Sequence, residues 1–294
     1  MASQIPRLPE VERLSPTCIR ILGGNPSKFT LQGTNTYLVG TGPSRLLIDT
    51  GEGRPSWLAA LKRVLQEERA TVSAALLTHW HHDHTQGVPQ LRQLVPDVAV
   101  YKYDPDHDEQ SITDGQTFAV DGATLTAVHT PGHTTDHMVF VFRQEDALFT
   151  GDNVLGHGTA VFEDLHIYLQ SLAKMETLVS GRAYPGHGPV LSEARGKIVE
   201  YIAHRQQREQ QVLQTLSLVN HASSRSYDSA DADIWTPMEL VKVIYADVPE
   251  NLHLPASHGV SQILKKLLRE DKVMVVDRGT TAGDSWRLKR KPSL

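Results

Sequence analysis

The sequence has almost no cysteine and no long apolar run. Cys18 is its single cysteine among 294 residues, which excludes an internal disulfide framework and a metal site made of several thiolates. No stretch approaches the run of about 18 apolar residues that a membrane-spanning helix requires. A metal site in this chain must therefore use histidine and carboxylate side chains, and we expect no membrane span.

An N-terminal targeting signal and an excess of basic residues are also lacking. Residues 1–14 contain no apolar signal-peptide core, and they carry Glu10 and Glu12, which transit peptides tend to avoid. We therefore expect a cytoplasmic protein. The 29 Lys and Arg are outnumbered by 34 Asp and Glu, which gives a net charge of -5. This balance disfavours a nucleic acid partner, although a local basic patch would be enough to bind one.

The hydrophobic pattern indicates a layered α/β domain over residues 1–220. Short apolar runs predict strands at 46–48, 74–77, 98–100, 124–128, 139–142 and 147–149. Helical spacing or composition predicts helices at 55–68, 164–178 and 192–216. This order favours two sheets with helices on their outer faces, an αββα sandwich, over a doubly wound sheet.

A smaller unit follows over residues 234–294, after a Ser-, Asp- and Ala-rich stretch at 221–233 that we predict to be a linker. Predicted helices at 238–245 and 260–270 precede predicted strands at 272–276 and 285–288, an order typical of a winged helix. From Ala222 onwards 11 Lys and Arg face 10 Asp and Glu. This balance does not indicate a DNA-reading face, and a fold alone does not define function.

The segment 79–84, His-Trp-His-His-Asp-His, directly follows an apolar strand. His79 and His81 are two residues apart, so on an extended backbone their side chains emerge on the same side, as two ligands of one ion require. Asp83 and His84 lie just past the strand and can turn toward a second ion. A lone histidine is more often a core or surface residue, but four in six residues beside an aspartate indicate a metal site.

Three further polar side chains each follow a predicted strand or an apolar lead, directly after a glycine. They are His133, Asp152 and His187. Together with 79–84, this pattern resembles the metallo-β-lactamase-fold superfamily, whose five ligand motifs occur here in order between about residues 33 and 190. That resemblance implies a dinuclear metal hydrolase.

Carried over residue by residue, the resemblance implies one ion bound by His79, His81 and His133, a second bound by Asp83, His84 and His187, and a bridging Asp152. Zinc lowers the pKa of bound water from about 15.7 to about 7, so a shared water would supply hydroxide. Asp83 would face this water and is the candidate general base. The nitrogen and oxygen donors favour two zinc ions but also admit manganese or iron.

One branch of the superfamily, the β-lactamase-like protein 2 group, is similar beyond the metal motifs. The similar segments are 31–38, 161–165, 201–205 and the winged-helix-like tail. Animal members of this branch are mitochondrial single-strand endoribonucleases, whereas fungal members are thioesterases that release aromatic polyketides from an acyl carrier protein. Segments 20–26, 150–158 and 181–187 most resemble the fungal thioesterases of the atrochrysone carboxyl ACP thioesterase type.

The resemblance therefore implies hydrolysis of a polyketide thioester carried by the acyl carrier protein domain of a non-reducing polyketide synthase. A single-strand endoribonuclease is the alternative, and the intact ligand set argues against a non-catalytic scaffold. Asn35, which can orient groups near the metals, and His157, in a glycine-flanked segment, are further candidates for the substrate site. A strand-edge turn and a plain tight turn are the respective structural alternatives.

Overall fold

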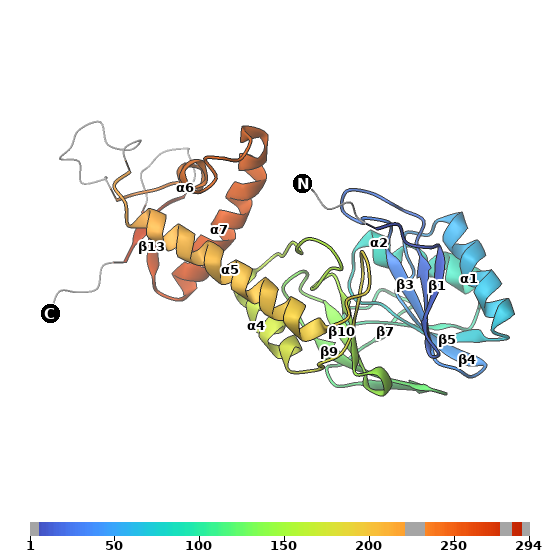
Figure 1. Cartoon of the computed structure of the whole chain (residues 1–294). Coiled ribbons are helices and arrows are strands. Elements are labelled where there is room, and N and C mark those ends of the chain that lie inside the picture. Colours follow the sequence, from blue (N-terminus) through green and yellow to red (C-terminus); the bar gives the residue numbers. More distant parts are fainter. Residues whose placement is uncertain (1–5, 221–232, 277–283, 290–294) are drawn as a thin grey trace. The chain divides into compact units, whose positions relative to one another are not determined.

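Two β-sheets that face each other form the framework of the first unit (Figure 1). The computed structural model describes residues 6–220, 233–276 and 284–289. The first sheet has the strand order β1-β2-β3-β4-β5-β6-β7, and the second has the order β12-β11-β10-β9-β8. The strands are β1 (Val11–Ser15), β2 (Cys18–Leu22), β3 (Asn35–Val39), β4 (Ser44–Ile48), β5 (Thr71–Leu76), β6 (Ala99–Lys102), β7 (Gln110–Ser111), β8 (Thr117–Val120), β9 (Ala123–His129), β10 (Met138–Phe142), β11 (Ala147–Gly151) and β12 (Ala183–Pro185).

The inner faces of the two sheets share one apolar core. Tyr37 and Leu76 of the first sheet are buried in the same cluster as Phe140 and Phe149 of the second. The rings of Tyr37 and Phe149 meet edge to face, with centroids 5.1 Å apart, an arrangement that aromatic pairs prefer. Dense packing between the sheets fixes the loops at their shared edge relative to one another.

Helices cover the outer faces. On the first sheet, α1 (Pro55–Glu67) and α3 (Val88–Leu94) place Trp57 and Leu91 against Leu47. Beside the second sheet lies α4 (Leu165–Glu176), with Tyr168 among its buried residues (Figure 1). A short turn, η1 (Arg143–Glu145), joins β10 to β11. The predicted αββα sandwich is confirmed, and all six predicted strands coincide with observed ones.

The chain divides into two units, Met1–Tyr201 and Ile202–Leu294, and α5 (Ala194–Leu216) runs across that division. The predicted domain limits at 220 and 234 stay a prediction. The predicted linker at 221–233 lies outside the described residues except for Asp233. Within the described part of the chain, no helix is both long and apolar enough to cross a membrane.

After α5, the described part of the second unit contains two helices and a hairpin, as the sequence predicts. A capping box starts α6 (Pro237–Ile244), because Thr236 and Glu239 each accept a hydrogen bond from the other's backbone N–H. After η2 (Glu250–Leu252) comes α7 (His253–Arg269), and β13 (Val273–Val276) pairs antiparallel with β14 (Ser285–Leu288). The helix predicted at 260–270 is longer than expected, because Pro255 falls in its first turn, where proline is tolerated.

Candidate metal centre

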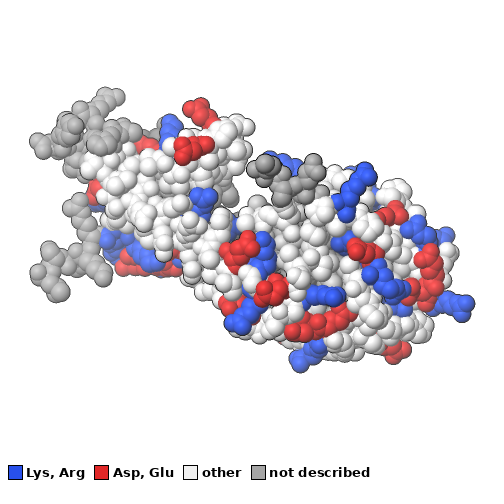
Figure 2. Space-filling model, in the orientation of Figure 1, with Lys and Arg blue, Asp and Glu red and all other residues white. Residues whose placement is uncertain are grey.

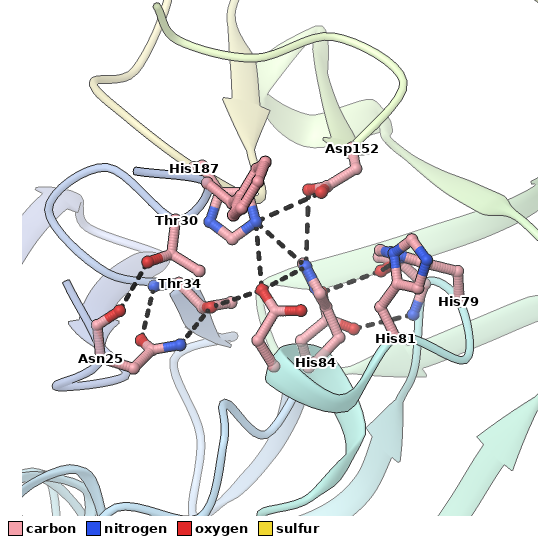
Figure 3. Close-up of polar contacts among 12 residues, drawn as sticks. Asn25, Thr30, Thr34, His79, His81, His84, Asp152 and His187 are labelled. Carbon is pink, nitrogen blue, oxygen red and sulfur yellow. Dashed lines mark hydrogen bonds and ion pairs between the residues drawn. The ribbon is translucent and has the colours of Figure 1, made fainter. Parts of the chain in front are cut away.

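All seven predicted ligands meet at one edge of the two sheets, and Figure 3 labels His79, His81, His84, Asp152 and His187 among them. His79 and His81 follow β5, and the short helix α2 (His82–Thr85) carries the next two ligands. His133 comes after β9, and the remaining two follow β11 and β12, which are parallel neighbours. Parallel strands end at the same edge of a sheet, so the residues after them emerge together. The seven ligands are His79, His81, Asp83, His84, His133, Asp152 and His187.

We call His79, His81 and His133 the three-histidine half of the cluster. His79 Nε2 lies 2.9 Å from His81 Nδ1, and His133 Nε2 lies 3.1 Å from the same atom. Asp152 Oδ2 is 3.7 Å from His133 Nε2. Ligand atoms of these four residues all lie within 4.8 Å of one another. Nitrogens that converge in this way can surround a single cation.

We call Asp83, His84 and His187 the mixed half. Asp83 Oδ2 is 3.3 Å from His84 Nε2 and 3.2 Å from His187 Nε2. Asp152 Oδ2 also lies 3.2 Å from His187 Nε2. Because the Asp152 carboxylate reaches both halves, it occupies the place of a shared ligand.

A buried carboxylate that the sequence did not reveal, Asp49, orients ligands in both halves. His84 Nδ1 donates to Asp49 Oδ2 over 2.7 Å. Thr78 Oγ1 donates to the same carboxylate over 2.9 Å and can therefore accept from His79 Nδ1, also 2.9 Å away. An imidazole that carries its proton on Nδ1 presents a lone pair on Nε2, as a metal ligand must. Asp49 thus turns both Nε2 atoms toward the cluster.

Other contacts also fit a bound metal. His133 Nδ1 donates to Val161 O over 2.8 Å, which leaves the lone pair on Nε2. Among the described residues no hydrogen-bond donor satisfies the buried Asp152 Oδ1, although His84 Nε2 lies 3.5 Å away. A Cβ on Gly186 would stand 2.4 Å from this oxygen, so only glycine leaves the space free. The donor set and its orientation fit divalent cations.

Two imidazoles of the three-histidine half, those of His79 and His81, are neutral. Burial lowers the pKa of His79 well below its usual value, and the neighbouring His84 and His133 lower it further. Burial and His133 likewise lower the pKa of His81 to about 4. These two imidazoles therefore carry free lone pairs at neutral pH.

In the mixed half, nearby carboxylates raise the pKa values of the histidines instead of leaving them lowered. Burial lowers the pKa of His187, but Asp152 and Asp83 outweigh it and raise the pKa to about 9. The pKa of His84 is also raised well above its usual value, because nearby carboxylates overcome its burial. In turn, His84 and His187 outweigh the burial of Asp83 and hold the pKa of that carboxyl below its usual range.

A hydrogen-bonded chain supports Asp83 from outside the cluster (Figure 3). Thr34 Oγ1 donates to Asp83 Oδ2 over 3.0 Å and accepts from Asn25 Nδ2 over 3.1 Å. Asn25 Oδ1 also accepts from Thr34 N over 2.9 Å. Thr34 is fully buried, so its hydroxyl is held in place for this contact to Asp83.

His137 is a second residue whose role the sequence did not reveal. It is fully buried, and its Nε2 accepts a hydrogen bond from Asp152 N over 3.1 Å. Its ring centroid lies 5.1 Å from that of His79. His137 therefore fixes the backbone that carries the bridging candidate. Asp49 directly follows the predicted strand at 46–48 and directly follows β4, as Asp152 directly follows β11, and this signal could have found it.

The two candidate substrate residues lie in different places. Asn35 is fully buried and donates to Pro185 O and Gly188 O, each over 2.9 Å, so it supports the loop that carries His187. His157 lines a cavity of about 370 Å³ above the cluster. Other side chains in its wall belong to Lys28, Phe29, Thr30, Leu31, Leu155, Thr159, Ala160, Val161 and the ligands His81, Asp83, His133, Asp152 and His187.

The αββα fold and this set of nitrogen and oxygen ligands define a metal-dependent hydrolase. The family model described as "Metallo-beta-lactamase superfamily" matches residues 29–107 and 95–187. The model "Beta-lactamase associated winged helix domain" matches residues 236–286, in agreement with the helices and hairpin of the second unit. The chain belongs to the metallo-beta-lactamase superfamily.

Fungal relatives match nearly the whole chain. An "Atrochrysone carboxyl ACP thioesterase" of Aspergillus fumigatus is 46% identical over 280 residues, covering 92% of this chain and 87% of the relative. "Lactamase-like protein adaB" of Aspergillus niger is 47% identical over 273 residues, covering 92% and 86%. A crystal structure of a beta-lactamase domain protein from Burkholderia ambifaria matches with a TM-score of 0.75 at 15% identity, covering 98% of this chain and 96% of that one. The last likeness shows the fold alone.

Proposed function

We propose that this protein is a thioesterase that releases an aromatic polyketide from an acyl carrier protein, with two divalent cations, preferably zinc, held by the seven ligands. The observation that carries the proposal is a complete, preoriented ligand set at the base of a cavity. The relative named as an atrochrysone carboxyl ACP thioesterase supports the choice of substrate. Zinc suits the five histidine nitrogens, and manganese is the next candidate.

Two bound cations would supply an acidified water and polarise the thioester carbonyl. Asp83, a carboxylate of the mixed half that also lines the cavity, is the candidate to accept a proton from that water. When OH adds to the acyl carbon and the C–S bond breaks, the products are a carboxylic acid and a thiol. The proton taken by Asp83 returns to the departing sulfur. Cys18 takes no part, because it is fully buried in the core between the sheets.

The endoribonuclease alternative is less well supported. Single-strand RNA sites combine a basic groove with several aromatic stacking platforms. Among the side chains that line the cavity, only Lys28 is permanently cationic and only Phe29 is an aromatic carbocycle. On the face shown in Figure 2, Lys and Arg are interspersed with Asp and Glu. These features favour an uncharged, apolar substrate over a polyanion.

The decisive experiment offers the zinc-loaded protein two substrates, an aromatic polyketide thioester on its carrier protein and a single-stranded RNA. We expect the acyl mass to disappear from the carrier and the RNA to stay intact. His84→Ala should abolish the reaction, whereas His82→Ala should preserve it, because His82 is an exposed histidine of the same helix. Cleavage of RNA without thioester hydrolysis would overturn the proposal.

A further inference from the structure

Two exposed apolar side chains stand at the cavity above the metal cluster. Phe29 is 77% exposed and Val161 is 68% exposed, and both line the cavity. Leu31, Leu155 and Ala160 extend this apolar wall. Large apolar side chains exposed to water around such a site indicate that a ligand binds over them, because removing apolar surface from water is favourable in free energy.

The turn that presents Phe29 is fixed by its own hydrogen bonds. Phe29 N donates to Ser27 Oγ over 3.2 Å, and Thr30 Oγ1 donates to Asn25 O over 2.5 Å. Asn25 is also bonded to Thr34, which contacts Asp83 (Figure 3). The ring of Phe29 is therefore carried by the same network that holds the candidate base.

The segment that presents Val161 is tied to the cluster from another side. Its carbonyl accepts the hydrogen bond from His133 Nδ1 over 2.8 Å, and Glu163 N donates to Gly132 O over 2.7 Å. Thus Phe29 and Val161 stand on two separate loops, each anchored to a ligand-bearing segment. Their distance from the reacting carbon is set before a substrate arrives, which is what substrate positioning requires.

A buried tyrosine supports the loop between Leu155 and Val161. The hydroxyl of Tyr201 accepts a hydrogen bond from Leu155 N over 3.2 Å and donates to Gly158 O over 2.8 Å. Tyr201 is 1% exposed. Because one hydroxyl bridges two points of the loop, the cavity wall keeps its shape without a ligand.

We propose that Phe29 and Val161 form an acyl clamp, the element that selects aromatic over short aliphatic acyl groups. The reaction that the clamp serves rests on the proposed function, but its binding preference does not. Planar acyl groups bury their faces against the Phe29 ring and the Val161 methyl groups while the carbonyl meets the cluster. A short acyl group contacts only the metal cluster, so it obtains no binding free energy from Phe29 and Val161.

The test compares the wild type with Phe29→Ala, Val161→Ala and the conservative Phe29→Trp, all zinc-loaded. Leu254→Ala is the matched control, because Leu254 is 73% exposed but lies in α7 of the second unit. Substrates are the anthracene-2-carboxyl and acetyl thioesters of N-acetylcysteamine, which share one leaving group. We expect Phe29→Ala to lower kcat/KM for the aromatic thioester by about 10- to 200-fold, mainly through KM, as pocket contacts do. The acetyl thioester should change less than twofold, and Phe29→Trp should restore the preference.

Binding of free anthracene-2-carboxylate, followed by its fluorescence, tests the clamp without turnover. We expect the wild type and Leu254→Ala to bind it alike, and Phe29→Ala and Val161→Ala to bind it at least about tenfold more weakly. If this pattern holds while the wild type hydrolyses neither thioester, the clamp stands and the proposed function alone fails. No binding by the wild type, or equal binding by all variants, would overturn the clamp. Melting curves confirm that each variant is folded.

Discussion

The two halves of the metal cluster are built alike from loops after strands, yet their charges differ. In the three-histidine half, burial and neighbouring imidazoles keep His79 and His81 neutral. In the mixed half, carboxylates raise the pKa values of His84 and His187, so these histidines are protonated at neutral pH when no metal is bound. The first half is therefore ready for a cation, whereas the second must exchange protons for one. The two halves should respond differently to mutation and to pH.

Removing the carboxylate shared by the two halves should have the largest effect. Asp152→Ala takes away the oxygen that lies 3.7 Å from His133 Nε2 and 3.2 Å from His187 Nε2. We expect fewer than two zinc ions per chain and a loss of hydrolysis of about a thousandfold, since metal ions contribute several kcal/mol to such reactions. Elemental analysis and thioester kinetics measure both effects. Asp97→Ala, at an exposed site outside the cluster, is the control. A wild type that binds only one ion would contradict the dinuclear assignment.

Asp49→Asn should separate the two halves. Asp49 bonds His84 directly but reaches His79 only through Thr78. Loss of such outer contacts typically costs 10- to 100-fold in metal affinity. We expect this loss for the ion in the mixed half, and a smaller loss for the ion in the three-histidine half. Chelator competition with zinc gives both constants. Thr78→Val should weaken only the three-histidine half, and equal weakening of both ions by this variant would show that the halves are not independently supported.

Zinc uptake by the metal-free protein should depend on pH more steeply in the mixed half than in the three-histidine half. His187, whose pKa is raised to about 9, keeps its proton below that pH, so zinc must displace it. Between pH 6 and pH 8, affinity for the ion in the mixed half should therefore rise with pH. The rise should be about tenfold per pH unit for each proton that the ion displaces. His81, with a pKa of about 4, has already lost its proton in this range, so affinity for the ion in the three-histidine half should change less. Zinc titrations at three pH values test this, and identical slopes would contradict it.

Apolar runs and helical spacing predicted most of the fold, and the resemblance to a known family implied the seven candidate ligands, because both leave local signals in the sequence. Strands such as 147–149 appear as apolar runs, and three of the candidate ligands, His133, Asp152 and His187, directly follow a glycine. Small errors arose at element ends. The helix predicted at 260–270 starts earlier, at His253, in the structure. Short partners such as β7 (Gln110–Ser111) are polar and exposed, so no apolar run revealed them.

The supporting residues were harder to predict because their partners are distant in the sequence. Thr34 contacts Asp83, 49 residues away, and Asp49 contacts His84, 35 residues away. Nothing in the composition around Asn25 or Thr34 distinguishes them from turn and strand residues. Such contacts exist only after the two sheets have packed, so they become visible in the structure alone.

Thr34→Val should give the smallest effect, and it tests whether the mixed half also depends on support from outside the cluster. The variant keeps the volume but removes the hydroxyl that donates to Asp83 Oδ2 over 3.0 Å. Hydrogen bonds to charged groups contribute about 1.5–3 kcal/mol, but Asp83 is also contacted by His84 and His187, so we expect only about a three- to tenfold fall in kcat. KM for an aromatic thioester and binding of anthracene-2-carboxylate should stay unchanged, because the apolar wall is intact.

Thr215→Val is the matched control, since Thr215 is a buried threonine of α5 that donates to Gln211 O. A rise in KM with no change in kcat would mean that Thr34 supports the cavity wall and not the candidate base.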